Sequence, residues 1–292
     1  VWAIESAGGL GYLLAQQLVA AGETVFDVSP MLAARVRLLG SGKSQKNDPN
    51  DARSVAVAAL RAERLTQVGP DDHARVLRML VKRHRDLGRA KNRAASRLHA
   101  LLLELTPGGS ASRMYTVNRA NAIIDAVEPC DEIGRQRAEI ARDLTDDIAR
   151  LDDQLKASKK RITTAVAASG TCLVEVSGVG PICAAQLIGY TGDIARFPTK
   201  GHYASYNATA PIEASSGPTR RHRLNPRGNR QLNWAIHIVA VSQISHPGPG
   251  RDYYERKLGE GKGSKEAIRA LKRRLSDVIY RHLIADATRA TG

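Results

Sequence analysis

The sequence predicts a small α/β region followed by a much longer, mainly helical region. Over residues 1–68, short apolar runs alternate with helical patterns across short links, which is typical of a parallel sheet. Residues 131–168 carry apolar side chains at steps of three, four or seven with charges between them, which predicts one long helix. A Gly-x-Gly turn then leads into an apolar helix and opens a third region. We therefore expect domains at 1–68, 69–168 and 169–292.

The first region begins with a strand and alternates from there. The expected elements are a strand at residues 1–5, a helix with apolar positions from Leu10 to Val19, a strand at Thr24–Val28, a helix at Met31–Leu39 and a helix that starts at Asp48. About 65 residues are too few for a complete doubly wound domain. Val1 also lies within an apolar run already. We therefore expect this sheet to lack its first strands, as if the chain began in the middle of a domain.

Two long helices are expected in the middle region. A basic helix runs from Asp71 to Leu105, and a short helix follows at residues 118–127. The helix at 131–168 approximates a coiled-coil seam. Its seam residues are Ile140, Leu144, Ile148, Leu151, Leu155 and Ile162. This seam fits two interpretations, packing within the chain and dimerisation.

The third region opens with a glycine turn of the helix-hairpin-helix type. Gly178 and Gly180 precede an apolar helix at residues 182–188. Such a turn exposes backbone N–H groups and the positive end of the helix dipole, which together hold one phosphate of a DNA backbone. A plain turn between helices is the alternative interpretation. Helical patterns follow at residues 231–244 and 265–283.

The charge of the chain predicts nucleic-acid binding. The 44 Lys and Arg residues against 29 Asp and Glu give a net charge of +15. Residues 75–113 carry a net charge of +8 and residues 196–282 carry +11, so that the rest of the chain sums to −4. Two separate positive surfaces favour nucleic acid over membranes or acidic proteins as the partner.

Cysteine usage and hydropathy predict a cytoplasmic protein. Cys130, Cys172 and Cys183 are odd in number and lack the C-x-x-C spacing, which argues against a disulfide framework and a structural zinc site. No run reaches the ~18 apolar residues that a membrane span needs, and no signal peptide is visible. We therefore expect no membrane partner.

A serine-containing loop followed by several arginines is the candidate site for chemistry on nucleic acid. Ser215 and Ser216 precede Gly217, and the basic residues that follow are Arg220, Arg221, Arg223, Arg227 and Arg230. A hydroxyl can attack a phosphodiester while guanidinium groups neutralise the developing charge. A polar loop that only holds nucleic acid is the alternative. The last helix adds a basic face at Lys272, Arg273 and Arg274.

Three acids in the first region are candidate ligands for Mg²⁺. Glu5 ends an apolar strand, where a charged residue is expected to face a site. Asp48 and Asp51 are three residues apart and share one helix face. Carboxylate oxygens from a strand and a helix start can hold a divalent cation. Helix capping is the alternative, with Asp48 as N-cap, Pro49 at the first helical position and Asp51 at the third.

Motifs along nearly the whole chain resemble the IS one-ten family of insertion-sequence transposases. The segments that resemble its RuvC-like (RNase H-like) domain are Glu5-Ser6-Ala7-Gly8-Gly9, Val25 to Pro30 and Lys46-Asn47-Asp48-Pro49-Asn50-Asp51-Ala52-Arg53. The segments that resemble its carboxy-terminal transposase domain are Ser177-Gly178-Val179-Gly180-Pro181, Gly192-Asp193 with Arg196-Phe197, Ser215-Ser216-Gly217 and Arg227-Gly228-Asn229-Arg230-Gln231-Leu232-Asn233.

The resemblance implies an RNA-guided DNA recombinase. Glu5, Asp48 and Asp51 would be the second, third and fourth acids of a metal tetrad whose first acid lies before Val1. Ser216 would be the nucleophile that forms a transient bond to DNA, with Ser215 as the alternative. A structured noncoding RNA would select donor and target DNA, dimers would pair into tetramers, and the protein would be associated with a bacterial nucleoid. A metal-dependent junction-resolving nuclease and a decayed, non-catalytic copy that only binds nucleic acid are the competing hypotheses.

Overall fold

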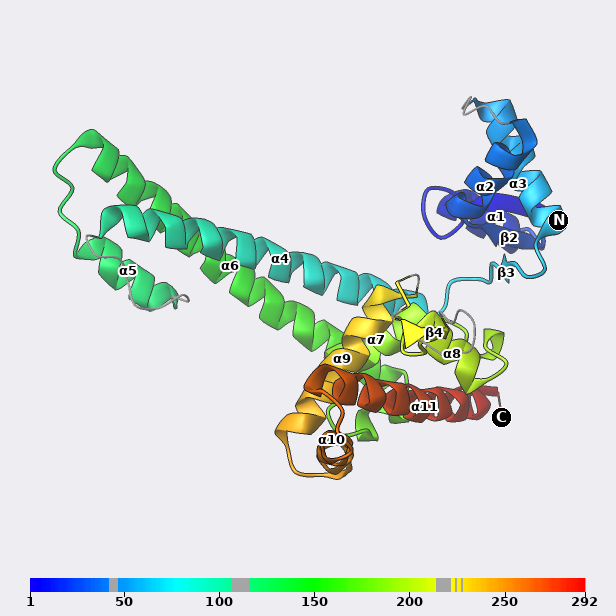
Figure 1. Ribbon diagram of the computed structural model, residues 1–292. Coiled ribbons are helices and arrows are strands. Elements are labelled where there is room, and N and C mark those ends of the chain that lie inside the picture. The colour runs from blue at the N-terminus through cyan, green and yellow to red at the C-terminus, as the bar shows by residue number, and fades with distance from the viewer. Residues whose placement is uncertain (42–46, 107–115, 214–221, 224, 227, 292) are drawn as a thin grey trace. The chain divides into compact units, whose positions relative to one another are not determined.

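The chain forms two compact units, residues 1–72 and residues 73–292 (Figure 1). The computed structural model describes residues 1–41, 47–106, 116–213, 222–223, 225–226 and 228–291. Both units hold their own hydrophobic clusters, and the second unit is built almost entirely of helices.

The first unit is a three-stranded sheet with helices. Its elements are β1 (Trp2–Glu5), α1 (Tyr12–Ala20), β2 (Val25–Val28), α2 (Pro30–Ser41), α3 (Asp48–Arg61) and β3 (Thr66–Gln67). β1 pairs with β2 in parallel, as the alternating pattern predicts, with Glu5 opposite Val28. β3 pairs with β2 in the antiparallel direction, so that the sheet is mixed and the expectation of a purely parallel sheet is wrong. The two exposed, polar residues of β3 carry no apolar pattern that would have predicted a strand.

The helix α3 brings the two aspartates to the sheet. Val55 and Ala58 of this helix are buried against Val28 of β2 and Ala33 of α2. Its N-cap is Asn47, whose side-chain oxygen accepts a hydrogen bond from the Asn50 N–H at 2.9 Å. The expectation that Asp48 caps the helix is therefore wrong by one residue, because asparagine caps as well as aspartate and stands one position earlier.

Two long antiparallel helices form the body of the second unit. They are α4 (His73–Leu105) and α6 (Glu132–Ala168), which run side by side with α5 (Val117–Asp125) packed near one end (Figure 1). Lys91 of α4 pairs with Asp152 of α6. Ile148 and Ile162 are buried in this hairpin, whereas Ile140 is 47% exposed. Packing of the coiled-coil seam within the chain is therefore confirmed over most of its length.

Shorter elements pack around the open end of the hairpin. They are η1 (Cys172–Glu175), α7 (Pro181–Thr191), η2 (Ile194–Arg196), α8 (Lys200–Tyr206), β4 (Ile212–Glu213), β5 (His222–Arg223), α9 (Arg230–Ser245), α10 (Pro249–Gly259) and α11 (Ser264–Thr291). Leu187 of α7, Ile236 of α9 and Ile279 of α11 are fully buried in one cluster that also takes Leu77 of α4. This core fixes α9 and α11 against each other, and these two helices carry the site below.

The three cysteines are free, and Cys183 is buried in the core. Across the described ranges, no helix combines the length and the apolar character that crossing a membrane requires.

Candidate nucleic-acid interface

The positive charge of the molecule belongs to the second unit. Residues 1–72 contain seven Lys and Arg against eight Asp and Glu, a net charge of −1. Residues 73–292 contain 37 against 21, a net charge of +16. Any surface that attracts a polyanion through net charge therefore belongs to residues 73–292.

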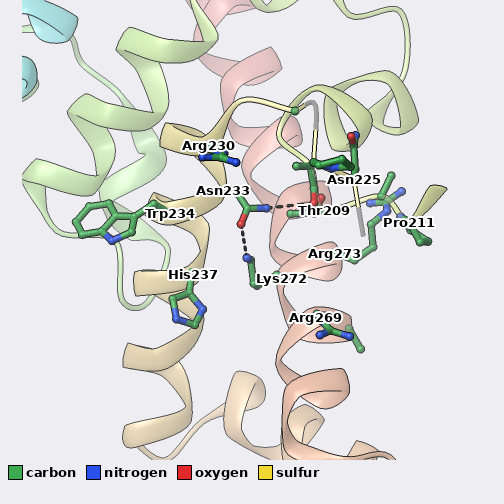
Figure 2. A pocket seen from close by; sticks show the side chains of 15 residues that line it. Thr209, Pro211, Asn225, Arg230, Asn233, Trp234, His237, Arg269, Lys272 and Arg273 are labelled. Carbon is green, nitrogen blue, oxygen red and sulfur yellow. Dashed lines mark hydrogen bonds between the residues drawn. The ribbon is translucent and has the colours of Figure 1, made fainter. Parts of the chain in front are cut away.

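A cavity of about 690 Å³ between α9 and α11 gathers several of these cations. Arg230, Asn233, Trp234 and His237 come from α9, and Arg269, Ala270, Lys272 and Arg273 come from α11 (Figure 2). The remaining lining residues are Ala208, Thr209, Ala210, Pro211, Asn225, Pro226 and Gly228. On α9 the lining positions recur at steps of three and four, so that one helix face forms one wall of the cavity.

Lys272 is the half-buried cation of this cavity. Its Nζ donates a hydrogen bond to Asn233 Oδ1 at 2.7 Å, and Asn233 Nδ2 donates to the carbonyls of Asn207 and Ala208 at 3.0 and 3.1 Å (Figure 2). Both donor positions of the Asn233 amide are thus directed at backbone, which turns its oxygen toward the lysine. Burial, reinforced by the positive charge of Arg269, lowers the pKa of Lys272 to about 8.

The cavity is positive without a compensating acid among the residues that are described as lining it. Arg273 is paired with Asp277, one turn further along α11. Burial and the charge of Lys272 lower the pKa of His237, so that this imidazole is neutral near pH 7. Arg230, Arg269 and Lys272 therefore supply the positive potential of the cavity.

In the sequence, the segment with the two serines lies between the strands β4 and β5. Ile212 pairs with Arg223 and Glu213 with His222 in a short antiparallel ladder. Pro211 and Asn225, which flank the ladder on either side, line the cavity. The intervening serines and arginines, Ser215, Ser216, Arg220, Arg221 and Arg227, lie outside the described residues. Described residues before and after this segment thus line the cavity.

Of the predicted cationic contacts, the structure brings Arg230, Lys272 and Arg273 together in one cavity. Arg274 points elsewhere, with its guanidinium carbon 5.0 Å from the centre of the Tyr253 ring. For Arg223 the structure gives the strand pairing with Ile212.

The glycine turn before α7 packs against α9. Gly178 has a φ of +81°, and a Cβ there would lie 3.1 Å from the Val239 carbonyl oxygen. The Ser177 carbonyl accepts a hydrogen bond from the Gln243 side chain at 2.7 Å. Gly180 is the N-cap of α7, and a Cβ there would meet no described atom within 4 Å. Gly178 thus has a packing role, and only the Gly180 side of the turn is open.

The predicted metal ligands do not form a ligand group in this arrangement. Glu5 and Asp48 are exposed, and Asp51 is ion-paired with Arg37 of α2. Within the described parts of the chain, no three acidic, histidine or cysteine side chains lie together as a metal site would require. Carboxylates are suitable ligands for Mg²⁺, and the Asp51 carboxylate is engaged by Arg37 in this arrangement.

Most of the residues that line the cavity were not predicted from the sequence. Asn233, Trp234, His237 and Arg269 were not predicted as site residues. Of these four, only Asn233 belongs to a sequence motif, the one that begins at Arg227. The other three look like ordinary exposed positions of a helix.

Two transposase family models match the chain. The model described as "Transposase IS116/IS110/IS902 family" matches residues 170–255, and the DEDD transposase model of the IS110 type matches residues 1–107. The chain belongs to the IS110 family of transposases. The first match contains α9 up to Ser245 and the β4–β5 ladder, and the second contains Glu5, Asp48 and Asp51.

Relatives of this transposase are proteins of bacterial insertion elements. The 44.8 kDa protein of insertion element IS116 from Streptomyces clavuligerus is 26% identical over 96% of this chain and 81% of its own length. The 43.6 kDa protein of insertion element IS110 from Streptomyces coelicolor is 37% identical over 37% of this chain and 27% of its own length. A probable family 20 transposase from Pseudomonas aeruginosa is 26% identical over 79% of this chain and 67% of its own length. DNA is accordingly the substrate class of this family.

Proposed function

We propose that this transposase exchanges strands between donor and target DNA through a covalent serine–DNA intermediate, with Ser216 as the nucleophile and Ser215 as the alternative. One observation carries the proposal. Pro211 and Asn225, which precede and follow the segment that bears both serines, line a cavity whose charged lining residues, among those described, are all cations. Attack of a hydroxyl on a phosphodiester needs such cations to neutralise the developing charge.

The proposed step conserves the phosphodiester energy. The serine Oγ bonds to phosphorus, the bond from phosphorus to the leaving sugar oxygen breaks, the hydroxyl gives up its proton and the leaving oxygen takes one up. Attack by a sugar hydroxyl of the other DNA on the serine ester reverses these changes and releases the serine. Strand exchange by this route therefore needs no ATP.

The cavity supplies charge stabilisation for this step. Lys272 is held by Asn233, which is itself held by two backbone carbonyls, so its ammonium group stays in place while charge develops on the phosphate. Arg230 and Arg269 add guanidinium groups from the two facing helices. Removing a preorganised donor of this type slows phosphoryl or acyl transfer by about 10²–10³-fold.

The match to the DEDD transposase domain supports the use of a divalent metal ion in this reaction. Glu5, Asp48 and Asp51 are the residues that would hold Mg²⁺, and a bound ion would polarise the scissile phosphate. The ion pair of Asp51 with Arg37 has to open before Asp51 can bind an ion.

We also propose a structured guide RNA and a dimeric or tetrameric assembly for this transposase. Residues 73–292 carry a net charge of +16, and the basic helix α4 lies in the same unit as the cavity. Positive charge on α4 and in the cavity supports contacts with more than one polyanion.

The test is to trap the adduct in cells that carry the whole element with its noncoding flanks, which supply any guide RNA. The protein is purified under denaturing conditions, and covalently attached DNA is measured. We expect DNA on the wild-type chain and on Ser215→Ala, and none on Ser216→Ala. The reverse pattern would assign the nucleophile to Ser215.

Two outcomes would contradict the serine mechanism. DNA cleavage without an adduct, unchanged in the Ser215→Ala/Ser216→Ala double variant, would identify a metal-dependent nuclease. Binding of DNA and RNA with neither adduct nor cleavage would identify a non-catalytic copy.

A further inference from the structure

Two chemically different kinds of residue line the cavity between α9 and α11. Three cationic lining residues, here called the cationic part, are Arg230, Arg269 and Lys272. The apolar lining residues, here called the apolar part, are Ala208, Ala210, Pro211, Pro226, Trp234 and Ala270. Figure 2 shows Arg230, Trp234 and His237 projecting from α9, with Arg269, Lys272 and Arg273 on α11. A ligand that satisfies both parts carries a negative charge and an apolar, flat group.

The cationic part calls for an anion. Lys272 is half-buried, and among the described residues its Nζ donates to the neutral amide of Asn233 rather than to a carboxylate. A cation that is withdrawn from water without a counter-ion is unfavourable, and a phosphate that arrives at Nζ removes this penalty. Arg269, one helical turn away from Lys272, reaches the same space.

The apolar part and the size of the cavity exclude a bare phosphate as the whole ligand. The volume of about 690 Å³ is typical of pockets that enclose a small organic molecule. Trp234 lines the cavity and is 51% exposed, so that its indole is accessible to a ligand. Aromatic side chains next to cations are the usual means by which proteins hold bases of single-stranded nucleic acid.

We infer that this cavity binds one unpaired nucleotide, with its phosphate on Lys272 and Arg269 and its base against Trp234. The inference rests on the proposed function for the substrate class and deepens it. A base within a duplex is stacked and paired, and cannot enter a cavity. The C-terminal unit therefore recognises a single-stranded or unstacked position in its nucleic acid, and not only the backbone of a duplex.

Tryptophan fluorescence tests this directly, because the chain has two tryptophans. In a Trp2→Phe variant of the whole chain, all tryptophan emission comes from Trp234. The probes are hexathymidylate, a fully abasic hexamer of the same length and a blunt 20-base-pair duplex rich in G and C. We expect saturable quenching by hexathymidylate and none by the abasic strand or the duplex.

Substitutions in the same background separate the two parts of the cavity. Lys272→Ala should weaken the quenching affinity for hexathymidylate by about tenfold or more, whereas Lys272→Arg keeps a cation there and should weaken it less. Lys265→Ala removes the same charge from an exposed position of α11 outside the cavity and should leave the affinity within about twofold. Unchanged circular dichroism confirms that each variant is folded.

Two results would overturn the inference. The first is equal quenching by the abasic strand or by the duplex. The second is binding of hexathymidylate, detected by fluorescence anisotropy of a labelled strand, without any change in Trp234 emission. Either result leaves the serine adduct of the proposed function untouched, and loss of the adduct with quenching intact would contradict the proposed function alone.

Discussion

Asn233 and Lys272 form the pair of residues on which the cavity depends. The lysine lies one turn from Arg269 and faces Arg230 and His237 across the cavity, while Arg273 is engaged by Asp277. An amide that donates to two carbonyls and accepts from an ammonium group has little freedom to turn. The lysine is thus positioned to bind an anion, and the burial that accompanies this position lowers its pKa.

Binding of single-stranded DNA should depend on pH through Lys272. A bound phosphate favours the protonated amine, and the free lysine loses its proton near pH 8 because its pKa is lowered to about 8. Affinity should therefore be constant below pH 7 and should fall as pH rises above 8, by up to about tenfold per pH unit where only the protonated form binds. The lowered pKa of His237 leaves this imidazole neutral in the range where Lys272 titrates.

The control is Lys272→Arg, whose guanidinium does not titrate in this range. Its affinity, measured by anisotropy between pH 6.5 and 9.5, should be nearly flat. A wild-type profile as flat as that of the arginine variant would show that Lys272 does not contact the phosphate.

At the residue scale, the sequence predicted the cations better than the groups that position them. Arg230, Lys272 and Arg273 belong to visible basic runs, and three of the predicted contacts do meet in one cavity. Asn233 and His237 act through the pairing of α9 with α11, and the sequence of either helix alone does not reveal this pairing. The Arg37–Asp51 pair was invisible for the same reason, since it joins two helices.

At the scale of elements, α4 and α7 cross at a glycine. A Cβ on Gly189 of α7 would lie 2.6 Å from the Arg78 nitrogen and 2.8 Å from its Cα. These are backbone atoms within the helix α4, so they cannot move aside as the tip of a side chain would. Only glycine allows α7 to approach α4 this closely.

Gly189→Ala should therefore lower the free energy of unfolding of residues 73–292 by about 1–3 kcal/mol. Gly88→Ala is the matched control, because this glycine also lies in a helix, yet a Cβ added to it would meet no atom of a described neighbour within 4 Å. It should raise the free energy of unfolding by about 0.5–1 kcal/mol through helix propensity. Urea unfolding followed by circular dichroism at 222 nm measures both, and a loss at Gly88 equal to that at Gly189 would contradict the crossing argument.

Long elements were predicted well and short ones were not. The expected helix at 131–168 and the expected end of the basic helix at Leu105 agree with α6 and α4 within one residue. These helices carry many turns of periodic pattern, which leaves little ambiguity. β4 and β5 have two residues each, and α8 has seven, so no period can develop, and their positions depend on tertiary pairing.

At the scale of the whole molecule, the hydrophobic clusters and the net charge are both divided between residues 1–72 and residues 73–292. The four hydrophobic clusters of the described residues each lie entirely within residues 1–72 or entirely within residues 73–292. The net charges of these parts are −1 and +16. The second part therefore contains its own core and the electrostatic surface together.

A fragment of residues 73–292 should fold and should bind nucleic acid as the whole chain does. We expect the same slope of log K against log salt concentration for a labelled duplex, because that slope counts the phosphates neutralised by Lys and Arg. Filter binding between 50 and 300 mM salt measures it. A clearly shallower slope in a helical, folded fragment would show that residues 1–72 contribute phosphate contacts despite their charge.

The lysine that faces no acid among the described lining residues of the cavity has a consequence for the life of the protein in a cell. A domain that withdraws a cation from water in this way is less stable empty than occupied, so nucleic acid acts as a folding partner as well as a substrate. At a ligand concentration a hundred times the dissociation constant, occupancy adds about 2.7 kcal/mol to stability. Protein bound to nucleic acid should therefore be degraded more slowly by proteases than free protein. The amount of protein in the cell should then depend on the amount of nucleic acid available to bind.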